Sequence, residues 1–262
     1  MSELLLMTLG GVFAGLFGSV LGLGGGVFII PMLTLLFGVP MREAIGVSLV
    51  CVIATSSGAA GLYVKKGLCD VRLGMTLELA TTVGAIAGGI VAGLLNEQVL
   101  SVLFAVLLLY SAWSMVRRSE NANDGDSPGY VEGAGRYTNL PLGMGASFFA
   151  GNVSGLLGVG GGIIKVPAMY LLMKVPLKTA VATSNFMIGV TAGAGAFIYF
   201  SRGEVHPLVA GSSMLGVFLG ATGGSRLLQK IKTALLKKIF VLVLGYLSIE
   251  MLFKGLGIKL PF

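Results

Sequence analysis

Long apolar runs, separated by short polar breaks, occupy almost all of the 262-residue chain. A helix needs about 20 apolar residues to cross a bilayer. Most of the runs approach or exceed that length, but two of them, at 27–38 and 162–173, are too short to cross alone. The pattern therefore predicts an all-α polytopic membrane protein, with runs at 5–22, 27–38, 42–64, 73–95, 98–116, 140–158, 162–173, 177–200, 207–226 and 234–254.

Charged residues are too scarce to cover the surface of a soluble protein. Asp, Glu, Lys and Arg make up 11% of the chain and apolar residues 55%, whereas soluble domains carry roughly 25% charged residues. Most of the surface must therefore face lipid. The 18 Lys and Arg residues fall in short clusters between apolar runs, which is typical of membrane topology and excludes nucleic acid as a partner. The start, MSELLLM, has no basic segment, so a cleaved signal peptide is not expected.

The two halves of the chain are copies of one another. A shift of 136 residues places 14–67 on 150–203 with 18 identities in 54 positions. The match aligns the glycine cluster GLGGG (22–26) with GVGGG (158–162). A polar stretch rich in Gly, Asn, Asp and Ser separates the copies and is typical of a solvated linker. The sequence thus predicts a first membrane repeat (1–116), a linker (117–139) and a second membrane repeat (140–262).

Basic residues indicate that the second repeat is inverted relative to the first. If the glycine-broken units, 5–38 and 140–173, each crossed the membrane once, Lys and Arg would divide nine to eight between the two sides. If each unit instead enters, turns at its glycines and returns, thirteen lie on one side and four on the other. Such an excess marks the cytoplasmic side. Each repeat is therefore expected to hold a glycine-broken re-entrant helix hairpin and three transmembrane helices. We expect a plasma (inner) membrane location, with the N-terminus outside and the 117–139 linker in the cytoplasm.

Each glycine cluster leads directly into a short apolar run, which predicts a turn at membrane depth followed by a half-helix. Non-helical backbone survives there only where it is buried in protein or lines a cavity. The first N–H groups of a helix lack partners and carry partial positive charge, and glycine lets a ligand approach them. We therefore predict that both clusters bind an anion near the midplane, as in secondary transporters. Tight packing is the alternative use of these residues, which are Gly24, Gly25, Gly26, Gly160, Gly161 and Gly162.

Lys165 breaks the match between the repeats, because its counterpart is Ile29. It falls in the first turn of the second half-helix, about 12 Å of helix rise from the loop at Lys174. A lysine at membrane depth costs about 2.5–3.5 kcal/mol on insertion scales, and an anion would offset that cost. We expect Lys165 to contact the substrate or line its path. A structural partner and an interfacial position are the alternatives.

Four other polar residues inside apolar runs are candidates to hydrogen-bond an oxyanion: Ser48, Asn152, Ser184 and Asn185. Bonds between helices are an equally ordinary use of such side chains. Glu78 lies only about five residues inside its run. No acid is therefore expected at the midplane, and no buried proton relay.

Prolines and further glycines make predictions about the helices themselves. Pro31 and Pro167 fall inside the half-helices, where a missing N–H produces either a structural kink or a hinge. Glycines four residues apart predict close contacts between helices, at Gly84 and Gly88 and at Gly220 and Gly224, with Gly89, Gly93 and Gly216 beside them.

Motifs of catalysis are not found in the sequence. It contains no nucleotide-binding loop, no nucleophile paired with a base and no clustered metal ligands. We therefore expect no enzymatic activity, no catalytic residue, no cofactor and no metal site.

The duplicated G-x-G-G-G-x4-P block, each copy followed by V-P and a basic residue, resembles the TauE/SafE sulfite exporter family, also called the 4-toluene sulfonate uptake permease family. The resemblance extends from about residue 5 to residue 255. It implies a secondary transporter of small sulfur-containing anions such as sulfite, thiosulfate or sulfonates, acting by alternating access across the plasma membrane. The alternatives are an anion channel and a non-transporting accessory subunit. The expected partners are a small anion and the lipid bilayer, with a homo-oligomer left open and the coupling ion unassigned.

Overall fold

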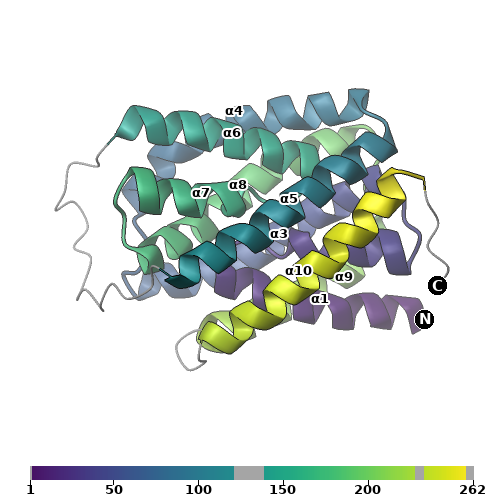
Figure 1. Cartoon of the computed structure of the whole chain (residues 1–262), viewed down its shortest axis with the longest axis horizontal. Helices are drawn as coiled ribbons and strands as arrows, with labels where there is room; N and C mark the ends of the chain where they lie inside the picture. The colour runs from purple at the N-terminus through teal and green to yellow at the C-terminus, as the bar shows by residue number, and fades with distance from the viewer. Residues whose placement is uncertain (1, 121–138, 228–232, 258–262) are drawn as a thin grey trace.

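The computed structural model describes residues 2–120, 139–227 and 233–257, and every regular element within them is a helix (Figure 1). The first half contains α1 (Ser2–Leu21), α2 (Gly26–Pro31), the π-helix η1 (Met32–Leu36), α3 (Met41–Lys65), α4 (Val71–Leu94) and α5 (Glu97–Glu120). The second half contains α6 (Leu140–Leu157), α7 (Gly162–Pro167), the π-helix η2 (Ala168–Leu172), α8 (Leu177–Ser201), α9 (Pro207–Leu227) and α10 (Thr233–Gly255). The predicted all-α fold is confirmed, with helices that coincide with the apolar runs. Most of the predicted linker, 121–138, lies outside the described residues, as do 228–232.

Local signals in the sequence explain where these helices begin. Pro40 and Pro176 precede α3 and α8 with extended backbone, because a proline ends one segment and its fixed φ suits the start of the next. The side chain of Asp70 accepts a hydrogen bond of 2.9 Å from the Leu73 amide and so caps α4.

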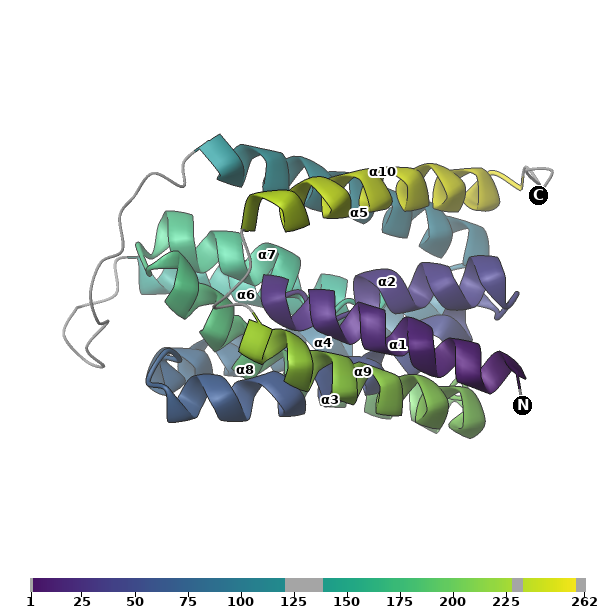
Figure 2. The ribbon, with the colours of Figure 1, turned by 90° about the horizontal axis from the view of Figure 1, so that it is seen from below.

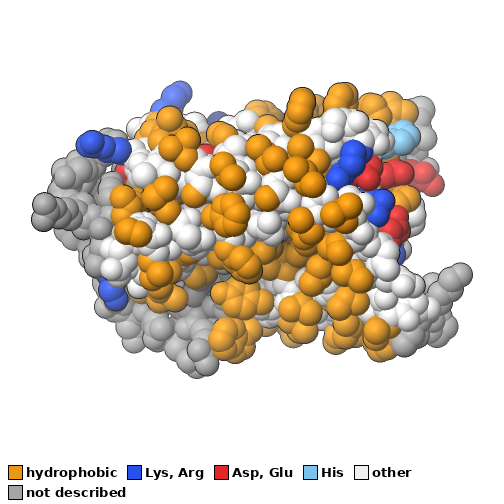
Figure 3. All heavy atoms as spheres, turned by 90° about the horizontal axis from the view of Figure 1, so that it is seen from above, with side chains coloured by type: hydrophobic (Ala, Val, Ile, Leu, Met, Phe, Trp, Pro, Cys, Tyr) orange, Lys and Arg blue, Asp and Glu red, His pale blue; other side chains and the backbone are white. Residues whose placement is uncertain are grey.

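The long helices are those of a multi-pass membrane protein. Six described helices have the length and hydropathy to cross a bilayer: α1, α3, α4, α6, α8 and α9. Large apolar side chains point outward along the flanks of the molecule (Figure 3). Leu79, Leu94 and Phe197 are 72%, 82% and 70% exposed, which is stable only where lipid covers them.

The two halves are interleaved, because each packs its first helix against a helix of the other. α1 lies against α9 and α4 lies against α6, while α3 pairs with α8 and α5 with α10 (Figures 1 and 2). The 136-residue shift places α1 on α6 and α4 on α9. The α1–α9 contact and the α4–α6 contact are therefore equivalent, as a two-fold relation between the repeats requires.

The starting helices of the two halves, α1 and α6, run in opposite directions along the long axis (Figures 1 and 2). The α3–α4 connection, which follows Lys65 and begins with Lys66, lies at one end of the molecule (Figure 2). Acidic side chains gather at the other end (Figure 3). Inversion of the repeats across a membrane stays a prediction, with which these directions agree.

Glycines bring the paired helices into direct backbone contact, as predicted. A Cβ built on Gly220 would lie 2.0 Å from the carbonyl oxygen of Val12, and one on Gly84 would lie 2.1 Å from that of Phe148. Both distances are far below van der Waals contact, so these positions admit no side chain without movement. Gly88, Gly216 and Gly224 make the same kind of backbone approach, whereas Gly89 and Gly93 face the side chains of Ile198 and Arg202.

Candidate functional site

Two buried glycine turns lie at the centre of the molecule, where α1 gives way to α2 and α6 gives way to α7. Gly24 and Gly25 have φ values of 85° and 73°, and Gly160 and Gly161 have 73° and 74°. These are left-handed conformations that side chains other than glycine rarely adopt. Each turn reverses the chain, so each first helix and the half-helix after it form a hairpin with a buried tip (Figures 1 and 2).

Each turn is tied to a long helix of the opposite repeat. The Ser48 hydroxyl of α3 donates a 2.8 Å hydrogen bond to the carbonyl oxygen of Gly158. The Ser184 hydroxyl of α8 donates a 3.2 Å bond to that of Gly22. Both residues of one bond become those of the other under the 136-residue shift. Ser48 and Ser184 were predicted to hydrogen-bond an oxyanion. In this conformation their hydroxyl groups instead form hydrogen bonds between the two repeats.

The starts of the two half-helices lie against each other's turns. A Cβ on Gly162 would fall 2.0 Å from the Gly22 carbonyl oxygen, and one on Gly26 would fall 2.5 Å from that of Gly158. Among the described residues, the amides of Gly26, Val27, Gly162 and Ile163 have no hydrogen-bond acceptor. Buried N–H groups without partners are rare in folded proteins, so these are places where a ligand or water would be stabilised.

The space between the turns is filled by two apolar side chains that sequence reasoning missed. A Cβ on Gly24 would contact Val52 and Ile188, each at 3.1 Å, and one on Gly160 would contact the same two residues at 2.8 and 3.4 Å. Val52 and Ile188 are also related by the 136-residue shift and are fully buried. In this conformation, Val52 and Ile188 thus close the space between the two glycine turns with apolar side chains.

Lys165 is buried beside the second turn and belongs to a polar cluster of three helices. Its ammonium donates a 2.7 Å hydrogen bond to the Thr191 hydroxyl of α8, which in turn donates a 2.6 Å bond to Glu78 Oε1 on α4. Lys165 Nζ lies 3.4 Å from Glu78 Oε2. Its Cε lies 3.4 Å from the position of a Cβ on Gly161. Lys165 therefore contacts both the carboxylate and the wall of the turn.

Glu78 has buried partners that the sequence did not predict. Its side chain is only 8% exposed and forms an ion pair with Lys165 within the helix bundle. The expectation of no acid at the midplane and no buried proton relay stays a prediction. Glu78 lies seven residues after the start of α4, but its partners come from helices far away in the sequence. The repeats differ here, since the shift places Ile29 and Met214 at the positions of Lys165 and Glu78.

The two asparagines differ in their surroundings. Asn185 is buried, and its amide donates to the carbonyl oxygens of Ser19 and Val181 at 3.2 and 3.0 Å. Its Oδ1 is a buried acceptor without a partner among the described residues. Asn152 is half-buried, and its backbone carbonyl faces Gly88 across the α4–α6 contact.

Both half-helices continue through their prolines as π-helices. Pro31 and Pro167 keep helical backbone angles, and η1 and η2 follow directly. Proline has no N–H group to donate within a helix, and the helix after each proline changes to the wider π-helical hydrogen-bond pattern. Such π-helical turns are frequent at functional sites. A hinge at either proline stays a prediction.

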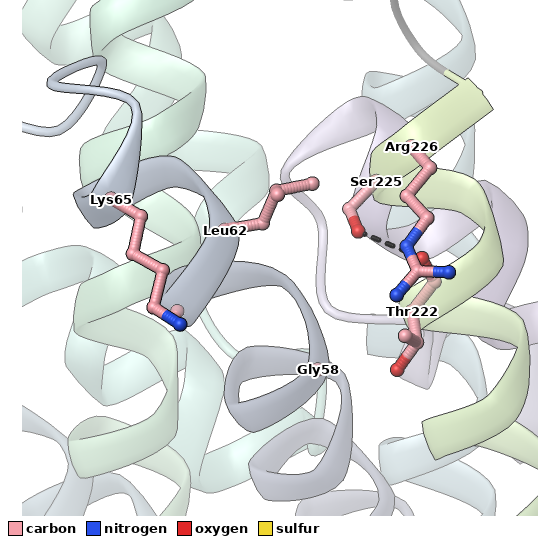
Figure 4. A pocket seen from close by; sticks show the side chains of 7 residues that line it. Gly58, Leu62, Lys65, Thr222, Ser225 and Arg226 are labelled. Atoms are coloured by element: carbon pink, nitrogen blue, oxygen red, sulfur yellow. Dashed lines mark hydrogen bonds between the residues drawn. The ribbon is translucent and has the colours of Figure 1, made fainter.

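A pocket opens at the end of the molecule that carries Lys65, between α3 and α9 (Figure 4). It has a volume of about 210 Å³ and is lined by Gly58, Gly61, Leu62, Lys65, Thr222, Ser225 and Arg226. Lys65 and Arg226 lie on its two walls, and the Ser225 hydroxyl donates a 3.0 Å bond to the Thr222 carbonyl oxygen. The pocket therefore presents positive charge on two helices.

Comparison with known proteins identifies the family of this architecture. The family model for sulfite exporter TauE/SafE matches residues 7–251. This chain belongs to the TauE/SafE family. A relative from Bacillus subtilis (strain 168), the probable membrane transporter protein YunE, is 30% identical over 98% of this chain and 99% of its own length. The probable membrane transporter protein MJ0441 of Methanocaldococcus jannaschii is 26% identical over 94% of both chains.

No solved structure matches the chain. Within the described residues, no group of three or more His, Cys, Asp or Glu side chains could hold a metal ion. The TauE/SafE membership and the relatives' names agree on a membrane transporter, the function that the sequence predicts at this level.

Proposed function

We propose that the protein is a secondary transporter of small sulfur-containing anions, such as sulfite, thiosulfate or sulfonates. The observation that carries this function is the buried Lys165 side chain, whose Cε lies beside the Gly161 turn at the junction of the two repeats. A buried cation inside a membrane bundle is expensive to maintain and is typical of a substrate or ion pathway. The family name, sulfite exporter, supports a sulfur oxyanion as the substrate.

The substrate binds, in this proposal, between Lys165 and the amides at the starts of the half-helices. The unpaired N–H groups of Gly162 and Ile163 belong to the same turn as Gly161. Backbone amides and one ammonium suit a compact oxyanion, because the oxygens accept several hydrogen bonds while the ammonium balances the charge. Ser48, Ser184 and Asn185 join the site when the bonds between the repeats open, and Asn152 lines the path along α6.

The closed centre supports alternating access as the mechanism. The turns are packed on Val52 and Ile188, so an anion reaches Lys165 when one repeat moves relative to the other. The glycine contacts between α1 and α9 and between α4 and α6 lie between the repeats, so they are the surfaces across which one repeat moves in this proposal. Pro31 and Pro167 act as hinges of the half-helices.

The pocket of Figure 4 serves as the vestibule on the cytoplasmic side. Lys65 and Arg226 attract anions to it. Gly58 in its wall lies about one helical turn from Thr55, whose hydroxyl donates to the Gly24 carbonyl oxygen at 3.1 Å. The vestibule thus leads toward the first glycine turn. This orientation places the N-terminus outside, the linker in the cytoplasm and the repeats in inverted topology in the plasma membrane.

Reconstitution tests the transport function. Purified protein in liposomes is expected to take up labelled sulfite, thiosulfate or sulfonates, but not carboxylates of similar size. Lys165→Met should abolish uptake, whereas Lys66→Met, which removes an exposed lysine at the α3–α4 turn, should leave it unchanged. Full activity of Lys165→Met would remove Lys165 from the site. Unitary currents without counterflow would indicate a channel, and absence of all flux would indicate an accessory subunit.

A further inference from the structure

Glu78, Thr191 and Lys165 form a closed polar cluster whose charge is balanced in the absence of substrate. Lys165 contributes one positive charge and Glu78 one negative charge, so the buried pair is neutral. The direct Lys165–Glu78 distance of 3.4 Å is longer than the roughly 2.8 Å of a strong charge-assisted hydrogen bond. The shorter bonds pass through Thr191, at 2.7 and 2.6 Å. The ammonium is therefore held mainly by a hydroxyl and is only loosely paired with its counter-ion.

The ammonium of Lys165 has three N–H donors, two of which meet Thr191 and Glu78. An anion bound at the Gly161 turn would become a second counter-ion for the same ammonium. The site would then contain one cation and two anions. A net negative charge at this depth in a bilayer is costly, so binding favours loss of the charge on Glu78.

We propose that Glu78 couples anion transport to protons, by taking up one proton whenever an anion pairs with Lys165. The inference rests on the proposed anion transport and adds the coupling ion. The Glu78 carboxylate takes a proton from the aqueous phase and becomes a neutral carboxylic acid as the anion binds. On the opposite side the anion leaves, the proton returns to water and the Glu78–Lys165 pair forms again. One proton and one monovalent anion thus cross together without net charge.

The surroundings of Glu78 make it the acceptor of this proton. α4 packs against α6 and α8. The α6 sequence, 140–157, contains no ionisable side chain, and α8 carries Lys178 in its first turn and Tyr199 near its other end. On its own helix, Arg72 lies six residues earlier. Among the described residues, the charged group within ion-pair distance of Glu78 is Lys165.

Glu78 lies nearer to one end of α4 than to the other. It lies seven residues after the start of α4, which is about 10 Å of helix rise. Its carboxylate accepts a further bond of 3.4 Å from the half-buried Thr82 hydroxyl, one turn further into the helix. In this proposal the proton arrives from that end of the molecule while the anion occupies the turn. The counterparts of Glu78 and Lys165 in the other repeat are Met214 and Ile29, so the cluster provides one coupling site per chain.

Proteoliposomes that contain the purified full-length protein test the coupling. Methanesulfonate is the first probe and 4-toluenesulfonate the second, because both are anions of strong acids and carry no proton themselves. Labelled uptake and the pH of the lumen, reported by a trapped dye, are measured with the membrane potential clamped at zero. For the native protein, an inward proton gradient should drive uptake, and an inward methanesulfonate gradient should acidify the lumen.

Glu78→Gln separates coupling from binding, because glutamine imitates the protonated acid but cannot release a proton. We expect proton-driven uptake and luminal acidification to be lost, while exchange of internal for external methanesulfonate continues. Glu97→Gln, at an exposed position in the first turn of α5, is the matched control and should behave as the native protein. Continued exchange also reports that Glu78→Gln has folded.

Several outcomes would overturn the assignment. Native protein that transports methanesulfonate with no response to a proton gradient would contradict coupling but leave transport intact. Proton movement that persists in Glu78→Gln would exclude Glu78 as the carrier. If Glu78→Gln shows no exchange, Glu78→Asp decides: proton movement with the anion supports the assignment, and anion movement without protons overturns it. Absence of sulfite, thiosulfate and sulfonate flux in the native protein would contradict the transport function itself.

Discussion

Gly220 of α9 offers a sharp test of how the repeats are held together. A Cβ on Gly220 would lie 2.0 Å from the Val12 carbonyl oxygen of α1, whereas an acceptable carbon–oxygen contact is about 3.3 Å or more. Gly220→Ala therefore requires the helices to separate locally by about 1.3 Å, and overpacking of this kind costs about 1–3 kcal/mol. At about 2 °C per kcal/mol for a chain of this size, the melting temperature should fall by about 2–6 °C.

The control lies three residues further along the same helix. A Cβ on Gly223 would meet nothing within 4 Å, so Gly223→Ala should add helix propensity, about 1 kcal/mol or less, without a clash. The chain already contains this substitution in its other copy, because the 136-residue shift places Ala87 at the position of Gly223. A Cβ on Gly84, the counterpart of Gly220, would lie 2.1 Å from the Phe148 carbonyl oxygen. Gly84→Ala should therefore destabilise as Gly220→Ala does.

Thermal unfolding in detergent, followed by size-exclusion chromatography of the soluble fraction, measures these differences. Gly220→Ala and Gly84→Ala should melt below the native protein, and Gly223→Ala at or above it. Equal melting temperatures for Gly220→Ala and Gly223→Ala would refute the backbone contact between α1 and α9. Transport by the destabilised variants, measured below their melting temperatures, then reports whether the same contact is used in alternating access.

Three further predictions concern the site. Ser48→Ala and Ser184→Ala should each cost about 1 kcal/mol, one hydrogen bond between the repeats, and equal melting of the double variant and native protein would argue against these bonds. Gly161→Ala should lose transport, because a left-handed conformation at φ 74° costs a residue with a Cβ about 1–2 kcal/mol; normal flux would show that the turn tolerates change. Lys165→Met should destabilise the protein by about 3–5 kcal/mol by leaving Glu78 buried and unpaired, whereas Lys165→Met combined with Glu78→Gln should recover most of that loss; no recovery in thermal unfolding would contradict the pairing.

The sequence alone determined the helices and their duplication. The bilayer allows little freedom here, because each spanning segment must satisfy its own backbone hydrogen bonds and be long enough to cross. Apolar runs therefore predicted α1 to α10 closely, and the GLGGG and GVGGG clusters predicted the breaks before α2 and α7. Glycine spacing predicted the contacts of Gly84 and Gly220, since a residue without a side chain in a lipid-facing helix marks a close approach.

The tertiary structure decided which side chains meet. Ser48 bonds Gly158 across 110 positions of sequence, and Glu78 meets Lys165 across 87. No helical period encodes such pairs, because they depend on how helices of different repeats are placed. Lys165 was noticeable in the sequence because a lysine inside a membrane has a high free-energy cost. Its partner could not be identified from the sequence, since Glu78 is an acid near the start of its predicted helix and has no distinguishing pattern. Distance along a helix is a property of one helix and can be counted in the sequence, whereas an ion pair is a property of several helices and needed the fold.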